Sequence, residues 1–297
     1  MFRPPPCHSV LLRSFASPRP VFGHGRRFYA QFKVDKTAED FDNLSTDEQL
    51  ERLTKLNASA ENNPDVDLWS LNADLLDLHV PEPVIRAAGK PLSLRTRVNN
   101  FLANQVNHFK NIFSMYRLAK ARSLPGVDTP KALRPGIFRV NSTSDTAWVA
   151  PLRRIAATTY NQVYRALADG DVRTIKKLTT KPYTSHLQAL LKSRTSPNQR
   201  FKWTLYSEVT PPQIVSIRTI EGHLGRGGPK LGNRLVIQAL IRFDTMQALE
   251  IYSRQGDLIS PKESSIPRRV TEYLALEKRM WYDAPWKIKQ QMFERSG

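Results

Sequence analysis

The sequence predicts an α+β fold in which N-terminal helices pack on a curved antiparallel sheet in the shape of a cone, preceded by a basic helical extension. Two observations support this prediction. A helical run covers residues 151–194, and five extended segments follow over residues 201–289 with almost no helix between them. This order is typical of α+β domains, in which helices cover one face of an antiparallel sheet. Such a cone offers either a pocket or a binding surface.

The distribution of charge favours a binding surface. Residues 1–34 contain six bases and no acid, and residues 35–82 contain thirteen acids and three bases. Residues 83–297 contain thirty-six bases and fourteen acids, within a total net charge of +18. A body this basic repels itself unless it binds a polyanion, so we expect rRNA or an anionic membrane as its partner.

Residues 1–29 are predicted to be a mitochondrial transit peptide, because they are rich in arginine and contain no acid. Arg27, Phe28 and Tyr29 resemble the processing pattern in which an arginine shortly precedes the cut. The only cysteine, Cys7, lies in this leader, which leaves the mature chain no thiol for a disulfide, a zinc site or a nucleophile. No apolar run approaches the ~20 residues that span a bilayer. We therefore expect a protein of the mitochondrial matrix, peripheral to the inner membrane.

The extension before the cone has two parts. Residues 30–91 are acidic and largely irregular, with a short helix predicted at 45–56. Residues 92–150 begin with a basic amphipathic helix over 92–122 and continue as a connector. Apolar side chains recur in the helix at steps of three and four: Phe101, Leu102, Val106, Phe109, Ile112, Phe113 and Tyr116. Such a helix lies in a membrane interface, fits a partner's groove or packs on its own domain; for membrane contact we select Phe101, Phe109, Phe113, Arg117 and Lys120.

The α+β domain is predicted over residues 151–297. Its first helix ends at Asp169-Gly170-Asp171, where Gly170 suits a C-cap and Asp171 an N-cap. Short helices follow at 172–178 and 183–192. Alternating apolar residues and turn signals then predict strands at 201–209, 213–223, 233–244, 246–255 and 268–280. The glycine-rich stretch 222–232 predicts an exposed basic loop.

The sequence offers little catalytic chemistry. The six histidines form no metal-ligand motif, and the glycines of residues 222–228 lack the lysine of a phosphate loop. Asp169, Asp171 and Asp244 lie at turns or strand ends, where capping is the more common role. We expect no metal, no cofactor, no small-molecule substrate and no enzymatic activity. A buried acid or histidine inside the cone would favour the alternative, a small-molecule enzyme.

Positioned cations are the remaining chemistry, and they suit phosphate groups. Lys192, Arg194, Arg200 and Lys202 surround the predicted start of the first strand. As residues that contact rRNA we select Arg153, Arg154, Arg173, Lys176, Lys177, Arg226, Lys230, Lys287 and Lys289.

Several segments of the domain resemble a known family. Residues 160–171, YNQVYRALADGD, resemble the helix and turn that open the C-terminal domain of the inner-membrane import-motor anchor. Residues 236–239 with 245–249 resemble the central hairpin of that domain, and residues 272–277 with Pro285-Trp286-Lys287-Ile288 resemble its final strand and tail. The family includes a mitoribosomal large-subunit protein at the tunnel exit and a fungal membrane-associated ribosome receptor, both with basic N-terminal extensions.

This resemblance implies a cone-shaped fold of the cystatin or nuclear-transport-factor type and a role beside the polypeptide exit. The partners it implies are large-subunit rRNA, ribosomal proteins, the inner-membrane surface, the insertase and nascent chains. An import-motor anchor that recruits a matrix chaperone is the alternative, although residues 30–150 lack the sustained heptads of a coiled coil.

Overall fold

The computed structural model describes residues 75–87, 90–123, 135–194, 199–223 and 228–294. These residues belong to one compact unit, Thr54–Gly297. The predicted transit peptide with Arg27, Phe28 and Tyr29, the helix predicted at 45–56, and Arg226 lie outside the described residues.

The helices begin and end at the residues that favour such ends. Helix α4 (Leu94–Lys120) follows Ser93, whose hydroxyl accepts a hydrogen bond from the Thr96 N–H at 3.2 Å. Helix α5 (Ala150–Asp169) ends at Gly170, which adopts a left-handed φ of 73°. The carboxylate of Asp171 caps α6 (Val172–Leu178) by accepting from two main-chain N–H groups, and α7 (Lys181–Lys192) follows. Both predicted caps, Gly170 and Asp171, are confirmed.

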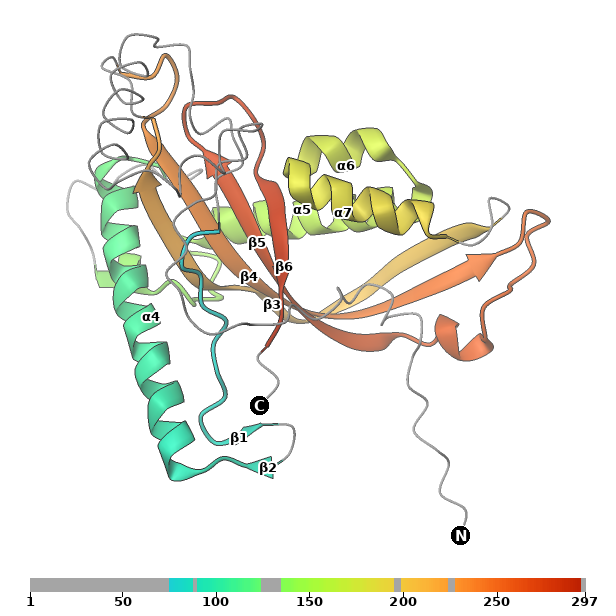
Figure 1. Cartoon of the computed structure of the whole chain (residues 1–297), viewed down its shortest axis with the longest axis horizontal. Helices are drawn as coiled ribbons and strands as arrows, with labels where there is room; N and C mark the ends of the chain where they lie inside the picture. The colour runs from blue at the N-terminus through green and yellow to red at the C-terminus, as the bar shows by residue number, and fades with distance from the viewer. Residues whose placement is uncertain (1–74, 88–89, 124–134, 195–198, 224–227, 295–297) are drawn as a thin grey trace, which may run out of the picture. The chain divides into compact units, whose positions relative to one another are not determined.

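Four antiparallel strands follow the helices in the order β3-β4-β5-β6. They are β3 (Arg200–Glu221), β4 (Leu235–Tyr252), β5 (Arg268–Arg279) and β6 (Lys287–Met292). A separate two-residue pair, β1 (Arg86–Ala87) and β2 (Lys90–Pro91), precedes α4, and the 3-10 turns η2 (Pro135–Phe138) and η3 (Lys262–Ser265) lie in connections. Helices followed by an open antiparallel sheet confirm the predicted α+β class (Figure 1).

The predicted division into five strands was wrong in two places. The segments 201–209 and 213–223 form the single strand β3, which passes Pro211 and Pro212 through a register shift between Thr210 and Gln213. A proline is tolerated there because β3 is an edge strand, and a bulge removes the need for a ladder hydrogen bond. The segments 233–244 and 246–255 likewise form one strand, β4. The closing strand β6 was not predicted as a strand.

The sheet is covered on both faces. Helix α5 packs on one face, where the Tyr160 ring stacks on Phe243 with centroids 4.4 Å apart. On the opposite face, Leu78 of the extended segment that precedes β1 packs in a small cluster with Val215, Leu240, Tyr273 and Ala275. In Figure 1 α5 passes behind the sheet while this extended segment crosses in front of it. Helix α4 covers the outer edge of β3, the first strand of the sheet.

Candidate functional site

Helix α4 turns a polar face toward the fold. Its buried residues Asn107, Asn111 and Ser114 are polar, and apolar residues are buried only in its last two turns, at Met115, Leu118 and Ala119. Asn111 is only 2% exposed. An amphipathic helix of a globular protein ordinarily buries its apolar stripe. The polarity of α4 is therefore inverted ahead of its last two turns.

The edge of β3 explains this inversion. Val215 has no partner on β4, because the register shifts between Ile214 and Ser216. The side-chain amides of Asn107 and Asn111 donate to the Val215 main-chain oxygen, and Asn111 Oδ1 accepts from the Ile217 N–H at 2.9 Å. Unpaired main-chain groups cost free energy when buried, so the helix that covers an edge strand must supply polar partners.

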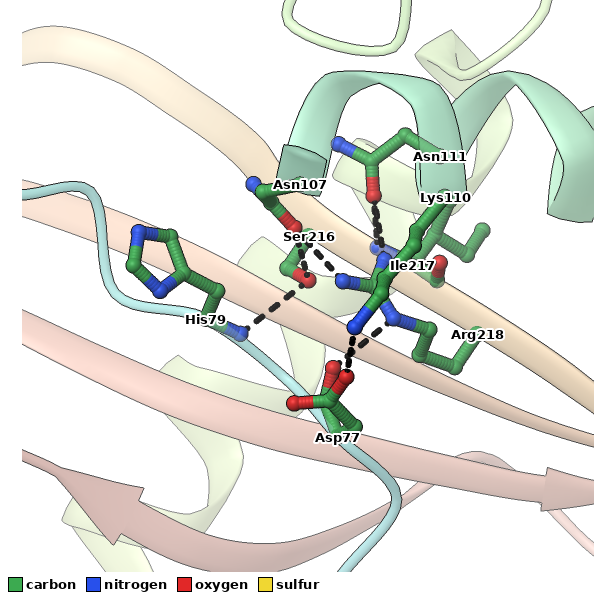
Figure 2. A network of polar contacts seen from close by, with 8 residues as sticks. All are labelled: Asp77, His79, Asn107, Lys110, Asn111, Ser216, Ile217 and Arg218. Carbon is green, nitrogen blue, oxygen red and sulfur yellow. Dashed lines mark hydrogen bonds and ion pairs between the residues drawn. The ribbon is translucent and has the colours of Figure 1, made fainter. Parts of the chain in front are cut away.

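Arg218 joins the same network to the extended segment (Figure 2). Its guanidinium donates to Asn107 Oδ1 and Asn111 Oδ1, both at 2.7 Å, and its Nε donates to the main-chain oxygen of Asp77 at 2.8 Å. Burial lowers the pKa of this arginine, and the nearby Asp77 carboxylate opposes that shift. The network fixes which side of α4 faces the sheet, because three chain segments share its hydrogen bonds.

The apolar side of α4 faces outward as a result. The exposed side chains of Phe109 and Phe113 retain 67% and 63% of their accessible surface. We define the apolar face of α4 as its exposed large apolar side chains: Leu94, Val98, Phe101, Leu102, Val106, Phe109, Phe113 and Tyr116. The helix spans ~40 Å, so this face is long enough to contact a flat surface over several turns.

Positive charge surrounds the apolar face. The sequence of α4 contains no Asp or Glu, and Arg95 and Lys120 are exposed near its two ends. Arg117 lies 3.4 Å from Glu221, and Lys110 forms an ion pair with Asp77, which lowers the pKa of that carboxyl chiefly through their hydrogen bond. Apolar side chains on one side and cations around them are the features of a helix that lies in a membrane interface.

Typical free energies indicate whether the apolar side chains or the cations of this surface contribute more to binding. Fully burying a large apolar side chain contributes about 1.5–3 kcal/mol. A cation near anionic lipid contributes about 1 kcal/mol. Because the eight apolar residues outnumber the exposed cations of α4, we expect apolar contact to supply most of the binding free energy. The cations would then set the preference for anionic lipid.

The structure distributes the predicted rRNA contacts unevenly. Arg153 and Lys289 are buried: Arg153 donates to the Ser144 main-chain oxygen at 2.6 Å, and Lys289 Nζ lies 2.7 Å from a Glu277 carboxylate oxygen. We therefore exclude Arg153 and Lys289 from the candidate RNA-binding surface. Lys287 is half-buried, and the exposed members of the set are Arg154, Arg173, Lys176, Lys177 and Lys230.

A half-buried acid, Glu272, lies between α5 and the sheet. Glu272 accepts hydrogen bonds from the hydroxyls of Tyr160 and Tyr164, each at 2.7 Å, and from Gln291 at 3.2 Å. Burial raises the pKa of Glu272, and these donors lower it in part. Because both carboxylate oxygens are engaged, the group joins α5 to β5 and β6 as a structural acceptor. This acid was not singled out from the sequence.

Among the described residues, no helix has the length and hydropathy needed to cross a membrane. In the same part of the chain, no three His, Cys, Asp or Glu side chains are grouped so that they could hold a metal ion.

Comparisons with solved structures give weak similarity. The intermembrane-space region of the chloroplast protein ARC6 is 13% identical, with 49% of this chain and 95% of that chain covered and a TM-score of 0.27. The putative transfer protein TraH of the Gram-positive conjugative plasmid pIP501 is also 13% identical, with 52% and 98% covered and a TM-score of 0.26. Both scores are too low to support a conclusion about this chain. A search of curated proteins finds no match.

A family comparison is more informative. The family model described as MBA1-like protein matches residues 133–296, which is more than half of the chain. The match includes α5, α6, α7 and the four-stranded sheet, whereas α4 lies before it. The segments in which the sequence resembles the import-anchor and ribosome-receptor family all fall inside this range. The chain belongs to the MBA1-like protein family.

Proposed function

We propose that this protein is a non-enzymatic tether that holds the large subunit of the mitochondrial ribosome at the inner membrane. Membership of the MBA1-like family fits a mitochondrial, membrane-associated protein with a ribosome-related role. The tether would engage several partners. Those partners are large-subunit rRNA and ribosomal proteins, the insertase and nascent chains. An import-motor anchor remains the alternative, and co-purification with the matrix chaperone would favour it.

One observation supports the membrane contact most directly: α4 presents apolar side chains outward while its asparagines satisfy the edge of β3. An exposed apolar stripe of this length is unusual for a monomeric soluble protein and marks a contact with a membrane or a protein. The occupant we assign is an anionic bilayer surface, because α4 carries only positive charges and Arg95 and Lys120 are placed to meet lipid phosphates.

Ribosome contact would use the other exposed cations. Arg173, Lys176 and Lys177 project from α6, and Arg154 from the start of α5. Each cation that neutralises a phosphate adds a salt-dependent increment to RNA affinity by counterion release. A protein with two such surfaces can bind lipid and ribosome together.

Flotation with lipid vesicles tests the membrane contact. We expect the Phe109→Asp/Phe113→Asp variant to bind phosphatidylcholine–cardiolipin vesicles at least about tenfold more weakly, because two apolar contacts are lost and two carboxylates must be desolvated. Its melting temperature should stay unchanged, since both phenylalanines are exposed. Vesicles of phosphatidylcholine alone should bind the unmodified protein more weakly.

The matched control is Asn99→Asp/His108→Asp, which adds the same two carboxylates at exposed positions beside the apolar face. Equal loss of binding in the control, or full binding by the phenylalanine variant, would contradict the proposal. Ribosome contact is tested separately: in density gradients of mitochondrial extract at low salt, the protein should sediment with the large subunit. Its absence from those fractions would reject the tether.

A further inference from the structure

The outer edge of β3 is protected along most of its length. Along residues 215–219, α4 supplies the hydrogen-bond partners: its two asparagines, and Arg117 Nη1, which donates to the Thr219 main-chain oxygen at 3.3 Å. Residues 206–213 are interrupted by register shifts and two prolines, which prevent another strand from pairing there. Residues 200–205 have no such protection, because they pair with β4 in unbroken register and contain no proline.

Three residues of this regular stretch direct their main-chain groups outward. Ile251 of β4 uses its main-chain groups on the side away from β3: its N–H donates to the Ser260 hydroxyl and its oxygen accepts from the Ser260 N–H, both at 3.2 Å. Phe201 lies opposite Ile251, so the two residues form a non-hydrogen-bonded pair, and Phe201 points its own N–H and oxygen away from β4. By the alternation of an antiparallel ladder, Trp203 and Leu205 do the same.

These outward groups have no hydrogen-bond partner within the described part of the chain. Their residues are half-buried, and a cavity of about 630 Å³ adjoins Phe201 and Trp203 beside the end of α5. A regular row of unpaired N–H groups and oxygens is the template on which an extended peptide adds as a further strand. The first part of β3 is therefore an open sheet edge with room beside it.

The side chains on both sides of this edge are mainly cationic. Arg200 and Lys202 are exposed and lie on the face of β3 turned away from α5, because they alternate with Trp203, which packs on α5. Lys202 keeps 63% of its side-chain surface exposed although a glutamate lies 3.3 Å from its Nζ. On the α5 side the cavity lining adds Arg165 and Arg194 and contains a single carboxylate. This excess of positive charge favours an acidic partner.

We propose that residues 200–205 of β3 bind an extended acidic segment of a partner protein, which adds to the sheet as a further strand. Its main chain pairs with the three outward-facing residues, and its side chains alternate between the row of Arg200 and Lys202 and the cavity beside α5. A second copy of this chain does not suit the edge, because pairing two such edges brings the same cations together on one face. The site is separate from the apolar face of α4 and from the cations assigned to RNA, so it does not depend on the tether.

The first test is fluorescence anisotropy of the full chain with a short labelled peptide of alternating glutamate and valine. We expect Arg200→Gln/Lys202→Gln to weaken binding at least about fivefold, because two charges that attract the acidic side chains are lost. The matched control, Arg139→Gln/Lys181→Gln, removes the same charge from other exposed positions and should weaken binding less than about twofold, by long-range electrostatics. All four residues are exposed, so melting temperatures should not change.

Amide hydrogen exchange distinguishes strand addition from general attraction of charge. When the peptide binds, exchange at the outward N–H groups of Trp203 and Leu205 should slow at least about tenfold. Exchange at Thr204 should change little, because its N–H already belongs to the β3–β4 ladder. A peptide that binds over one face of the ribbon would not produce this alternation.

Several outcomes would overturn the proposal. Equal loss in both variants, or equally tight binding of a lysine–valine peptide, would mean that charge is not read at this edge. Exchange that slows equally at consecutive amides, or at none, would exclude strand addition. Binding that appears only in the Glu61→Gln/Asp65→Asn/Asp67→Asn/Asp74→Asn variant of the full chain would assign the edge to this chain's own acidic residues. A dimer that the peptide dissociates would assign it to a second copy.

Discussion

Asn107 and Asn111, one turn apart on α4, both donate a side-chain N–H to the same main-chain oxygen, that of Val215, at 3.0 and 3.2 Å. Their amide oxygens accept from β3 in return, Asn107 from the Ser216 hydroxyl and Asn111 from the Ile217 N–H. The two amides thus replace the strand that would otherwise pair with this edge. Because these hydrogen bonds are directional, they fix the rotation of α4 about its axis.

Removing one of these amides should destabilise the fold. We expect Asn111→Leu to lower the free energy of unfolding by about 2–3 kcal/mol, because the Ile217 N–H and part of the Arg218 guanidinium lose their acceptor in a buried site. Urea denaturation measures the change. Asn99→Ala, an exposed substitution on the same helix, should change stability by less than about 0.5 kcal/mol. Equal stability of the two variants would show that the edge of β3 does not need α4.

Arg218 requires an arginine rather than any cation. We expect Arg218→Lys to cost about 1–3 kcal/mol, since an ammonium group cannot reproduce the planar fork that contacts Asp77, Asn107 and Asn111 together. The segment around Asp77 should then be cut faster in limited proteolysis. Arg139→Lys, on an exposed side chain, is the control. An unchanged rate of cleavage would mean that Leu78 packing alone holds the segment.

Asp244 should make stability depend on pH. Its buried carboxylate accepts two hydrogen bonds from Arg269, at 2.8 and 2.7 Å, and these hold its pKa below the usual value. A carboxyl with a lowered pKa in the folded state stabilises the protein above its unfolded pKa, and this contribution is lost as the pH falls through the folded value. We expect Asp244→Asn to be less stable than the unmodified protein at neutral pH.

The difference in free energy of unfolding between the unmodified protein and Asp244→Asn should narrow as the pH falls below the ordinary pKa range of carboxyl groups. Urea midpoints of both proteins, measured across the pH series, supply the comparison. A gap that stays constant with pH would mean that geometry, and not the charge of Asp244, produces the effect.

Gly232 occupies a position that no other residue fits. Its φ is 58°, and a Cβ built there would lie 2.0 Å from the main-chain oxygen of Met280. We expect Gly232→Ala to lower the free energy of unfolding by more than about 2 kcal/mol, because backbone strain and a collision with main chain add. Gly228→Ala meets nothing within 4 Å and is the control. Equal melting temperatures of the two variants would show that residue 232 does not lie this close to the Met280 main-chain oxygen.

Local signals were sufficient to predict the helices. The caps at Gly170 and Asp171 are confirmed because a left-handed glycine and a capping carboxylate act within a few residues of the chain. Local signals could not predict that two segments form the continuous strand β3 and two others the continuous strand β4. The sequence predicts Asp244 at the end of a strand, yet it lies within β4 because Arg269 of β5, distant in sequence, compensates its charge. Pro211 and Pro212 lie between the strands predicted at 201–209 and 213–223, yet the bulged edge of β3 accommodates them within one strand.

The sequence alone determined that α4 has one apolar and one polar side, since Phe109 and Phe113 recur at helical spacing opposite Asn107 and Asn111. It did not determine which side faces the protein, because an apolar stripe packs equally well against a core. The tertiary structure decided this. An edge strand leaves main-chain groups that only polar side chains satisfy, so the asparagines turn inward and the phenylalanines remain outside.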